Sequence, residues 1–131
     1  ARTGQIVPAT DGALVRCIYE SLSMKYRYAI RQIQENTNKQ FSVLHLLGGG
    51  TKDNFLCQLT ADVLEFPVIA GPTEATALGN IMLQLIALGE IPDVATGREM
   101  IRKSEKVTIY YPEAVDALDE KYNAFCKAIQ K

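Results

Sequence analysis

Residues 44–59 read LHLLGGGTKDNFLCQL, and this stretch decides the fold. It belongs to a nearly unbroken apolar run, residues 41–47, that is typical of a strand buried on both faces. After the three glycines, apolar residues such as Phe55 and Leu59 recur at helical spacing, and Thr51 is suited to cap the start of that helix. The pattern therefore predicts a buried strand that passes through a glycine turn into a helix.

A second strand and helix follow in the same order. Residues 67–70 are too short for a helix and are bounded by Gly71, so we expect a second buried strand there. Residues 73–88 are apolar nearly all round and end before Gly89, which is suited to the C′ position of a helix. Because a helix that is hydrophobic on every side belongs in a protein interior, we expect the helix at 73–88 to be buried.

The rest of the chain flanks this unit. An amphipathic helix is predicted from Thr10 or Asp11 to near Asn36, because its apolar residues fall three, four or seven apart. We expect the remaining segments to be a shorter helix, an extended segment and a closing helix, at residues 94–103, 107–111 and 112–131. The order predicts an α/β fold with short buried strands and covering helices, in a single domain over residues 1–131.

The composition describes a globular domain with almost balanced charge. The 131 residues include 14 Lys and Arg against 15 Asp and Glu, a formal net charge of -1. Because no basic run is present, we expect no nucleic-acid partner. No apolar run reaches the roughly 18 to 20 residues of a membrane-spanning helix, and no signal-peptide core is visible. We therefore expect no membrane partner and a cytoplasmic location. The start on Ala1, in a polar loop, suggests a piece of a longer protein.

The cysteines and the single histidine do not form a recognisable catalytic or metal-binding pattern. Cys17, Cys57 and Cys126 lie far apart without the paired spacings of a zinc site or a disulfide framework, so we interpret them as buried thiols. His45 lies within an apolar strand and is expected to be a hydrogen-bonded interior histidine. The sequence therefore assigns no metal ligand.

The chemical signal is the glycine turn, Gly48, Gly49 and Gly50, between a strand and a helix. Glycines let a ligand approach backbone N–H groups, and a helix start attracts anions, so the turn suits a nucleotide phosphate or ribose. A purely structural tight turn explains the same glycines, and the stretch is neither a Walker loop nor a dinucleotide fingerprint. Thr73 begins the next helix at the same edge of the sheet. Gly79 inside that helix indicates a close helix or sheet contact.

Two stretches taken together identify a family. Residues 44–62, LHLLGGGTKDNFLCQLTAD, and residues 68–80, VIAGPTEATALGN, resemble the C-terminal domain of FGGY-family carbohydrate kinases. The resemblance covers roughly residues 10 to 111. It implies part of a ribonuclease H-like, actin-like ATPase domain that binds ATP in a cleft between two lobes. The intact enzyme would transfer the γ-phosphoryl of ATP to a sugar hydroxyl with Mg²⁺, and the 71–80 segment implies L-rhamnulose as the sugar.

The resemblance also assigns residues. Gly49 matches the family glycine that contacts the nucleotide, with Gly48 and Gly50 beside it. Asp53 and Asn54 fall where family members place an Asn near the nucleotide, and either of the two is a candidate to reach the ligand. The sugar-binding residues and the catalytic base belong to an upstream lobe, so no catalytic residue is assigned here and the fragment alone is expected to be inactive. Without that lobe, the apolar surface that would contact it is exposed, so we expect that the fragment could self-associate.

Two other functions remain open on the residues alone. The chain could be a stand-alone module that uses the glycine turn for another phosphorylated ligand, in which case it would bind tightly without a partner. It could also be a structural α/β module in which all glycines serve turns.

Overall fold

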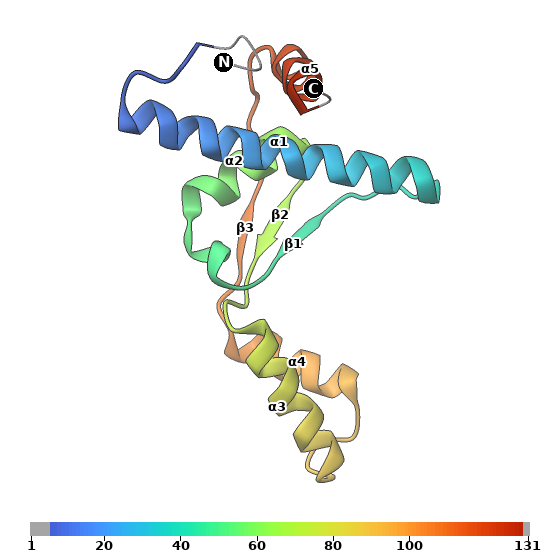
Figure 1. Cartoon of the computed structure of the whole chain (residues 1–131). Helices are drawn as coiled ribbons and strands as arrows, with labels where there is room; N and C mark the ends of the chain where they lie inside the picture. The colour runs from blue at the N-terminus through green and yellow to red at the C-terminus, as the bar shows by residue number, and fades with distance from the viewer. Residues whose placement is uncertain (1–5, 130–131) are drawn as a thin grey trace.

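A computed structural model describes residues 6–129 and their α/β fold (Figure 1). The described elements, in chain order, are α1 (Asp11–Thr37), β1 (Leu44–Leu46), the 3-10 turn η1 (Gly49–Lys52), α2 (Asn54–Leu64), β2 (Val68–Ala70), α3 (Ala75–Ala87), α4 (Val94–Ser104), β3 (Thr108–Tyr110) and α5 (Leu118–Ile129).

The three strands form one sheet in the order β1-β2-β3. β1 and β2 are parallel and are joined by α2, because parallel neighbours need a crossover connection. β2 and β3 are antiparallel, with Ala70 opposite Thr108. The carboxyl ends of β1 and β2 and the amino end of β3 therefore lie at one edge of the sheet.

The core lies among the helices α1, α2 and α5 and continues between α2 and the sheet (Figure 1). One cluster joins these three helices through Met24, Leu59, Val63, Leu118 and Tyr122. A second cluster joins α2 to the sheet through Ala61, Leu64 and Val68. Apolar burial of this kind is the main force that holds a domain of this size together.

Arg27 ties the three helices together from within the core. Its side chain is 4% exposed, and its Nη1 donates to the Val63 carbonyl oxygen at 2.7 Å. Its Nη2 lies 2.9 Å from a carboxylate oxygen of Glu65 and 3.1 Å from one of Asp119. The guanidinium also stacks over the Tyr122 ring, 5.1 Å from its centre. The buried charge is thus paired with two carboxylates and a carbonyl oxygen, as a buried cation requires.

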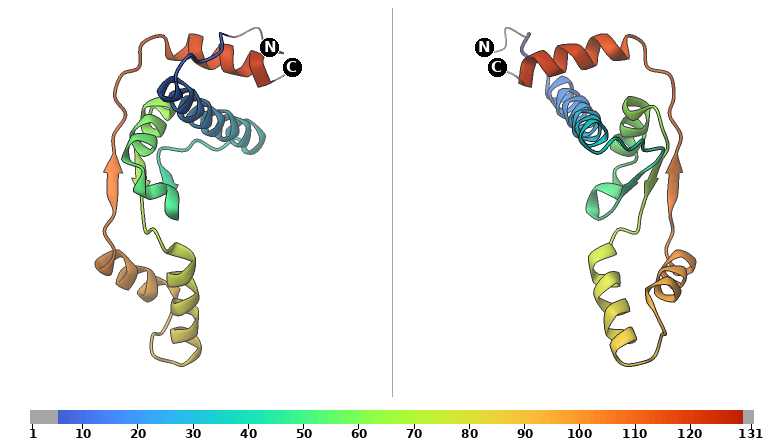
Figure 2. Two further views of the ribbon diagram at one scale, coloured as in Figure 1. Left: turned by 60° about the vertical axis from the view of Figure 1, so that its left-hand side comes forward. Right: turned by 90° about the vertical axis from the view of Figure 1, so that its right-hand side faces the viewer.

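α3 and α4 form a helical hairpin that projects from the sheet edge, away from α1 and α5 (Figures 1 and 2). No residue of α3 is buried. The prediction that the helix at 73–88 lies in an interior is therefore wrong for the described chain. The reason is that α3 packs mainly against α4, which covers only one of its sides.

The prediction of a first strand buried on both faces is also wrong. β1 is an edge strand with half-buried Leu44 and Leu46 and an exposed His45 between them. Leu44 and Leu46 pack toward α2, whereas alternation places His45 beside its register partner Ile69 on the opposite face. That face has no covering helix layer within residues 6–129 (Figure 2). His45 is consequently exposed rather than an interior histidine.

Three local predictions need correction. Thr51 does not cap α2, because it lies within η1 and Asp53 is the N-cap. Cys17 is exposed on α1, while Cys57 is buried and Cys126 half-buried. The closing helix begins at Leu118 instead of residue 112, because side chains of α2 bind the backbone before it. The Gln58 amide donates to the Tyr111 carbonyl oxygen at 2.8 Å, and an Asp62 carboxylate oxygen accepts from the Glu113 N–H at 2.9 Å.

Other sequence predictions are confirmed. Thr10 caps α1 by accepting a hydrogen bond from the Ala13 N–H. β2 is the central strand with Val68 and Ala70 buried, and Gly89 follows α3 with a φ of +77°. The last two residues of the expected closing helix, 130 and 131, lie outside the described part of the chain.

Candidate functional site

The three connections at the strand ends meet at one edge of the sheet. The Gly71 N–H donates to the Leu46 carbonyl oxygen at 2.9 Å, and the Gly48 N–H donates to the Pro72 carbonyl oxygen at 3.3 Å. These bonds hold the glycine turn after β1 against the segment between β2 and α3. The arrangement lies at the carboxyl edge of the parallel pair, where open α/β sheets bind ligands.

The glycines at this edge serve different purposes. Gly48 has a φ of +86°, and Gly71 has a φ of +119°, so both need the backbone freedom of glycine. A Cβ on Gly71 would also lie 3.1 Å from the Lys106 carbonyl oxygen. Gly49 and Gly50 have neither property, because their φ is not positive and an added Cβ would meet nothing within 4 Å. Nothing in the described chain requires glycine at these two positions, and their backbone is open to a ligand.

Two threonines join the glycine turn to the start of α3. Thr51 Oγ1 donates to the Gly48 carbonyl oxygen at 2.7 Å and lies 3.1 Å from Thr73 Oγ1. Because Thr51 has one hydroxyl proton and gives it to Gly48, Thr73 is the donor between the two hydroxyls. The sequence pattern placed Thr73 at this edge but not its contact with Thr51, since the two are 22 residues apart.

Asp53 binds its own chain with both carboxylate oxygens. Oδ1 accepts from the Leu56 N–H at 3.0 Å and caps α2, and Oδ2 accepts a short hydrogen bond from the Tyr19 hydroxyl. These bonds hold the pKa of the Asp53 carboxyl below its ordinary value, with the Tyr19 bond as the larger cause. The same bond raises the pKa of Tyr19. Tyr19 thereby fixes α1 against the end of the glycine turn.

Asn54 and Cys57 lie in α2, just after the turn. The Tyr110 hydroxyl donates to Asn54 Oδ1 at 2.8 Å and so links α2 to β3. The Cys57 thiol lies beneath the turn, 3.8 Å from the Gly50 carbonyl oxygen, where burial and the nearby Asp53 carboxylate raise the pKa of the thiol. Of the five predicted site residues, the three glycines therefore face open space, while Asp53 and Asn54 hold the start of α2.

The two helix starts at this edge differ in what they offer a ligand. Asp53 supplies a carboxylate to the first turn of α2. In α3 the N-cap residue Glu74 makes no side-chain hydrogen bond to the first turn. Backbone N–H groups at a helix start attract anions, so this edge joins open glycine backbone, hydroxyl groups and a helix start suited to a phosphate group.

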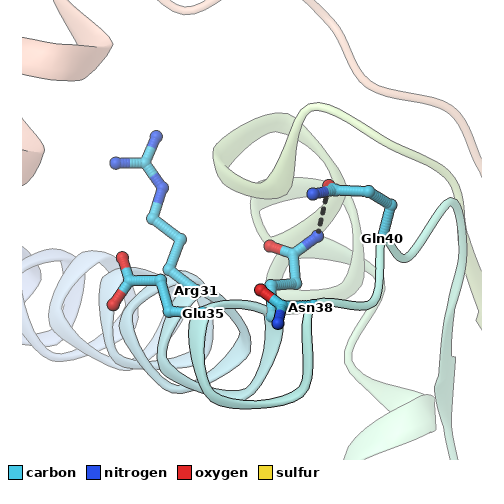
Figure 3. A pocket seen from close by; sticks show the side chains of 5 residues that line it. Arg31, Glu35, Asn38 and Gln40 are labelled. Atoms are coloured by element: carbon cyan, nitrogen blue, oxygen red, sulfur yellow. Dashed lines mark hydrogen bonds between the residues drawn. The ribbon is translucent and has the colours of Figure 1, made fainter.

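A polar hollow elsewhere lacks these properties (Figure 3). It lies at the end of α1 and is lined by Arg31, Gln34, Glu35, Asn38 and Gln40. Asn38 and Gln40 precede β1, whereas the glycine turn follows it, so the hollow and the turn lie at opposite ends of that strand. The Gln34 and Gln40 side chains bond to each other at 3.2 Å. The candidate site is therefore the glycine turn.

The model of the FGGY family of carbohydrate kinases, C-terminal domain, matches residues 1–88. The chain belongs to this family. The fold is accordingly part of the ribonuclease H-like, actin-like ATPase fold of FGGY C-terminal domains.

Relatives give the same assignment. The chain is 40% identical over 128 residues to a rhamnulokinase of Bacteroides thetaiotaomicron, an alignment that covers 98% of this chain and 26% of that protein. It is 40% identical to a rhamnulokinase of Bacillus subtilis, with coverages of 88% and 24%, and 44% identical to one of Pectobacterium atrosepticum, with coverages of 85% and 22%. The chain thus spans about a quarter of the length of the curated relatives it matches.

The family implies ATP and a divalent metal ion. The described residues suit part of the nucleotide but provide no cluster of metal ligands. The open backbone at Gly49 and Gly50 leaves room for part of a nucleotide. Within residues 6–129 no three His, Cys, Asp or Glu side chains gather into a metal-binding group. Among the same residues no helix is long and apolar enough to span a membrane.

Proposed function

We propose that the chain forms part of the nucleotide-binding lobe of an ATP-dependent sugar kinase, which transfers the γ-phosphoryl of ATP to a hydroxyl of L-rhamnulose. The observation that carries the proposal is the open backbone of Gly49 and Gly50, which neither conformation nor packing of the described chain explains. The rhamnulokinase relatives at 40–44% identity support the choice of sugar.

Each part of the site has a role in this proposal. Gly49 and Gly50 let the nucleotide approach the backbone closely, and Gly48 supplies the left-handed turn that presents them. Tyr19 and Tyr110 fix the side chains of Asp53 and Asn54 at the end of the turn. Mg²⁺ would neutralise phosphate charge and be held by the nucleotide together with residues outside this chain.

The sugar and the catalytic base belong to the rest of the longer enzyme in this proposal. Phosphoryl transfer needs groups positioned on both sides of the phosphates, and this chain supplies one side. The isolated chain should therefore bind nucleotide weakly, with a dissociation constant on the order of millimolar, and show no kinase turnover. An ATP-dependent kinase of this kind would act in the cytoplasm.

The test uses the open space at the turn. Gly49→Ala adds a methyl group where no atom of the described chain lies, so the fold should be unchanged while a ligand is excluded. Amide chemical shifts are followed as ADP and Mg²⁺ are added to the chain, with Gly12→Ala as the matched control, because Gly12 on α1 has equally open surroundings. We expect saturable shifts at residues 48–54 that weaken about tenfold in Gly49→Ala and stay unchanged in Gly12→Ala.

A chimera extends the test to the whole enzyme. The chain replaces the matched region of the Bacteroides thetaiotaomicron relative, and ATP-dependent phosphorylation of L-rhamnulose is measured. Gly49→Ala should raise the KM for ATP and leave the KM for the sugar unchanged. Equal ATP kinetics with and without Gly49→Ala would contradict the placement of the nucleotide. Tight binding of another phosphorylated ligand to the isolated chain would instead favour a stand-alone module.

A further inference from the structure

α3 is an apolar helix that the described chain covers only in part. Only Thr76, Asn80 and Gln84 carry polar side chains in it, yet none of its residues is buried. Helices that are hydrophobic around their whole circumference normally lie in an interior. The exposure of α3 therefore indicates a partner outside residues 6–129.

α4 accounts for one side of this helix. Leu78, Met82 and Leu85 on α3 line a groove with Ile101 of α4. Gly97 of α4 allows the close approach, since a Cβ there would lie 2.4 Å from the Met82 side chain. The side of α3 that faces α4 is thus explained by contacts within the hairpin.

A second apolar stripe on α3 does not line this groove, and its members are half-buried or exposed. Gly79, Leu83 and Ile86 stand at positions i, i+4 and i+7, roughly a quarter turn away from the stripe that faces α4. Leu83 is 56% exposed, and a Cβ on Gly79 would meet nothing within 4 Å. Glycine is unfavourable inside a helix, so an open glycine between apolar residues marks a place where another backbone comes close. The expected contact at Gly79 is therefore missing from the described chain.

We propose that this stripe, Gly79, Leu83 and Ile86, docks against the remainder of a longer kinase chain. The inference rests on the proposed function, because it takes the chain to be part of a longer enzyme. Relatives carry about three quarters of their length outside the matched region, which is ample material to cover a helix.

The shape of the apolar surface favours this occupant over a second copy of the chain. A two-fold pair of α3 helices would bring one patch of each helix together. α3 exposes apolar side chains in more than one direction, with Ile81 53% exposed, Leu83 56% and Leu88, just beyond the helix, 75%. Elements of a longer chain can pack on several of these sides at once. α3 also begins two residues after Thr73, which bonds to Thr51 of the glycine turn, so its occupant lies close to the candidate nucleotide site.

The test compares thiol labelling of α3 in the isolated chain and in the full-length chimera. Leu83→Cys is made with Cys17→Ser, which removes the exposed native thiol, and Cys126 stays in all proteins as a common baseline. Lys103→Cys in the same background is the matched control, because Lys103 lies on the same hairpin with a side chain that is 75% exposed. We expect the thiol at position 83 to react at least about tenfold more slowly in the chimera, while the thiol at position 103 reacts alike in both.

Each outcome decides the proposal. Fast reaction at position 83 in both proteins would overturn it. Protection in the isolated chain that grows with protein concentration would assign α3 to a second copy and overturn the stated occupant. If Leu83→Cys prevents the chimera from folding, hydrogen exchange of the α3 amides in the unsubstituted chain and chimera gives the same comparison.

The test also separates this inference from the proposed function. A protected thiol in a chimera that does not phosphorylate L-rhamnulose would keep the docking and reject the function. An active chimera with a fully reactive thiol at position 83 would keep the proposed function and reject the docking of α3.

Discussion

α2 and α3 occupy equivalent places in the fold but differ completely in burial. Each follows a strand, β1 or β2, at the same edge of the sheet, and they have 11 and 13 residues. Seven residues of α2 are buried, whereas none of α3 is. α3 is nevertheless the more apolar of the two in sequence. The comparison teaches that burial depends on which elements lie within reach, and apolar composition alone does not supply them.

The partners of α2 come from distant parts of the chain. α1 covers it through Met24, α5 through Leu118 and Tyr122, and the sheet through Val68. Arg27 of α1 also donates to the Val63 carbonyl oxygen in the last turn of α2. Within residues 6–129, α3 packs mainly against α4, a helix that follows it directly in sequence.

The largest expected difference between the two helices is in the free energy of unfolding lost when a leucine in each is replaced by alanine. Leu59→Ala in α2 removes a side chain that is 8% exposed in the main cluster, and it should lower the free energy of unfolding by about 3 kcal/mol. Leu83→Ala in α3 removes a side chain that is 56% exposed and should change it by less than about 0.5 kcal/mol. Urea unfolding of the isolated chain measures both.

If Leu83→Ala lowered the free energy of unfolding nearly as much as Leu59→Ala, the contrast between the helices would be wrong. Such a result would mean that α3 is already covered in the isolated chain. Repeating both unfolding measurements at two protein concentrations shows whether a second copy of the chain covers α3.

A smaller effect is expected from the two helical glycines of the hairpin. Gly79→Ala should stabilise α3 by up to about 1 kcal/mol, because alanine favours a helix and no neighbour opposes the added methyl group. Gly97→Ala should instead destabilise the hairpin, since its methyl group would lie 2.4 Å from the Met82 side chain and force it to move. Hydrogen exchange of the amides of α3 and α4 reports each change locally. A loss of protection in Gly79→Ala would show that another segment already lies against this glycine.

The expected difference between the two helix starts depends on pH. The pKa of the Asp53 carboxyl is lowered in the folded chain, so its ionised form stabilises the fold above the ordinary value of 3.8, and this contribution is lost as pH falls through the lowered value. Asp53→Ala should therefore lower the melting temperature at neutral pH, and the gap to the parent chain should narrow in acid. Glu74→Ala, at the uncapped start of α3, should leave the melting temperature unchanged. A gap that stays constant down to about pH 2 would contradict the role of the Asp53 charge.

Local pattern was sufficient for most of the elements. α1, α2, β2 and α4 follow from periodicity, caps and breakers, because those signals act within a few residues. The burial of β1 and α3 was predicted wrongly. An apolar run indicates that a segment favours burial, but it does not identify the element that packs against it. The start of α5 at Leu118 depends on bonds from Gln58 and Asp62, more than 50 residues earlier.

The candidate site divides in the same way. The glycines Gly48 to Gly50 could be found from sequence, because strand, glycines and helix are consecutive. The hydrogen bonds that fix the turn join residues 34 and 56 apart, Tyr19 with Asp53 and Asn54 with Tyr110. No periodicity predicts such pairs, and Tyr19 carried no signal beyond its place on an amphipathic helix. The distinction between a turn glycine and an open glycine likewise needed the atoms around each Cβ.

The antiparallel pairing of β2 and β3 has a consequence for how this chain can change over evolutionary time. Ala70 and Thr108 are register partners, so the whole α3–α4 hairpin leaves the sheet and returns to it at a single pair of residues. An excursion anchored in this way can lengthen, shorten or exchange its surface without shifting the alignment of either strand. An insertion or deletion within the hairpin would therefore leave the sheet edge and its glycine turn in place.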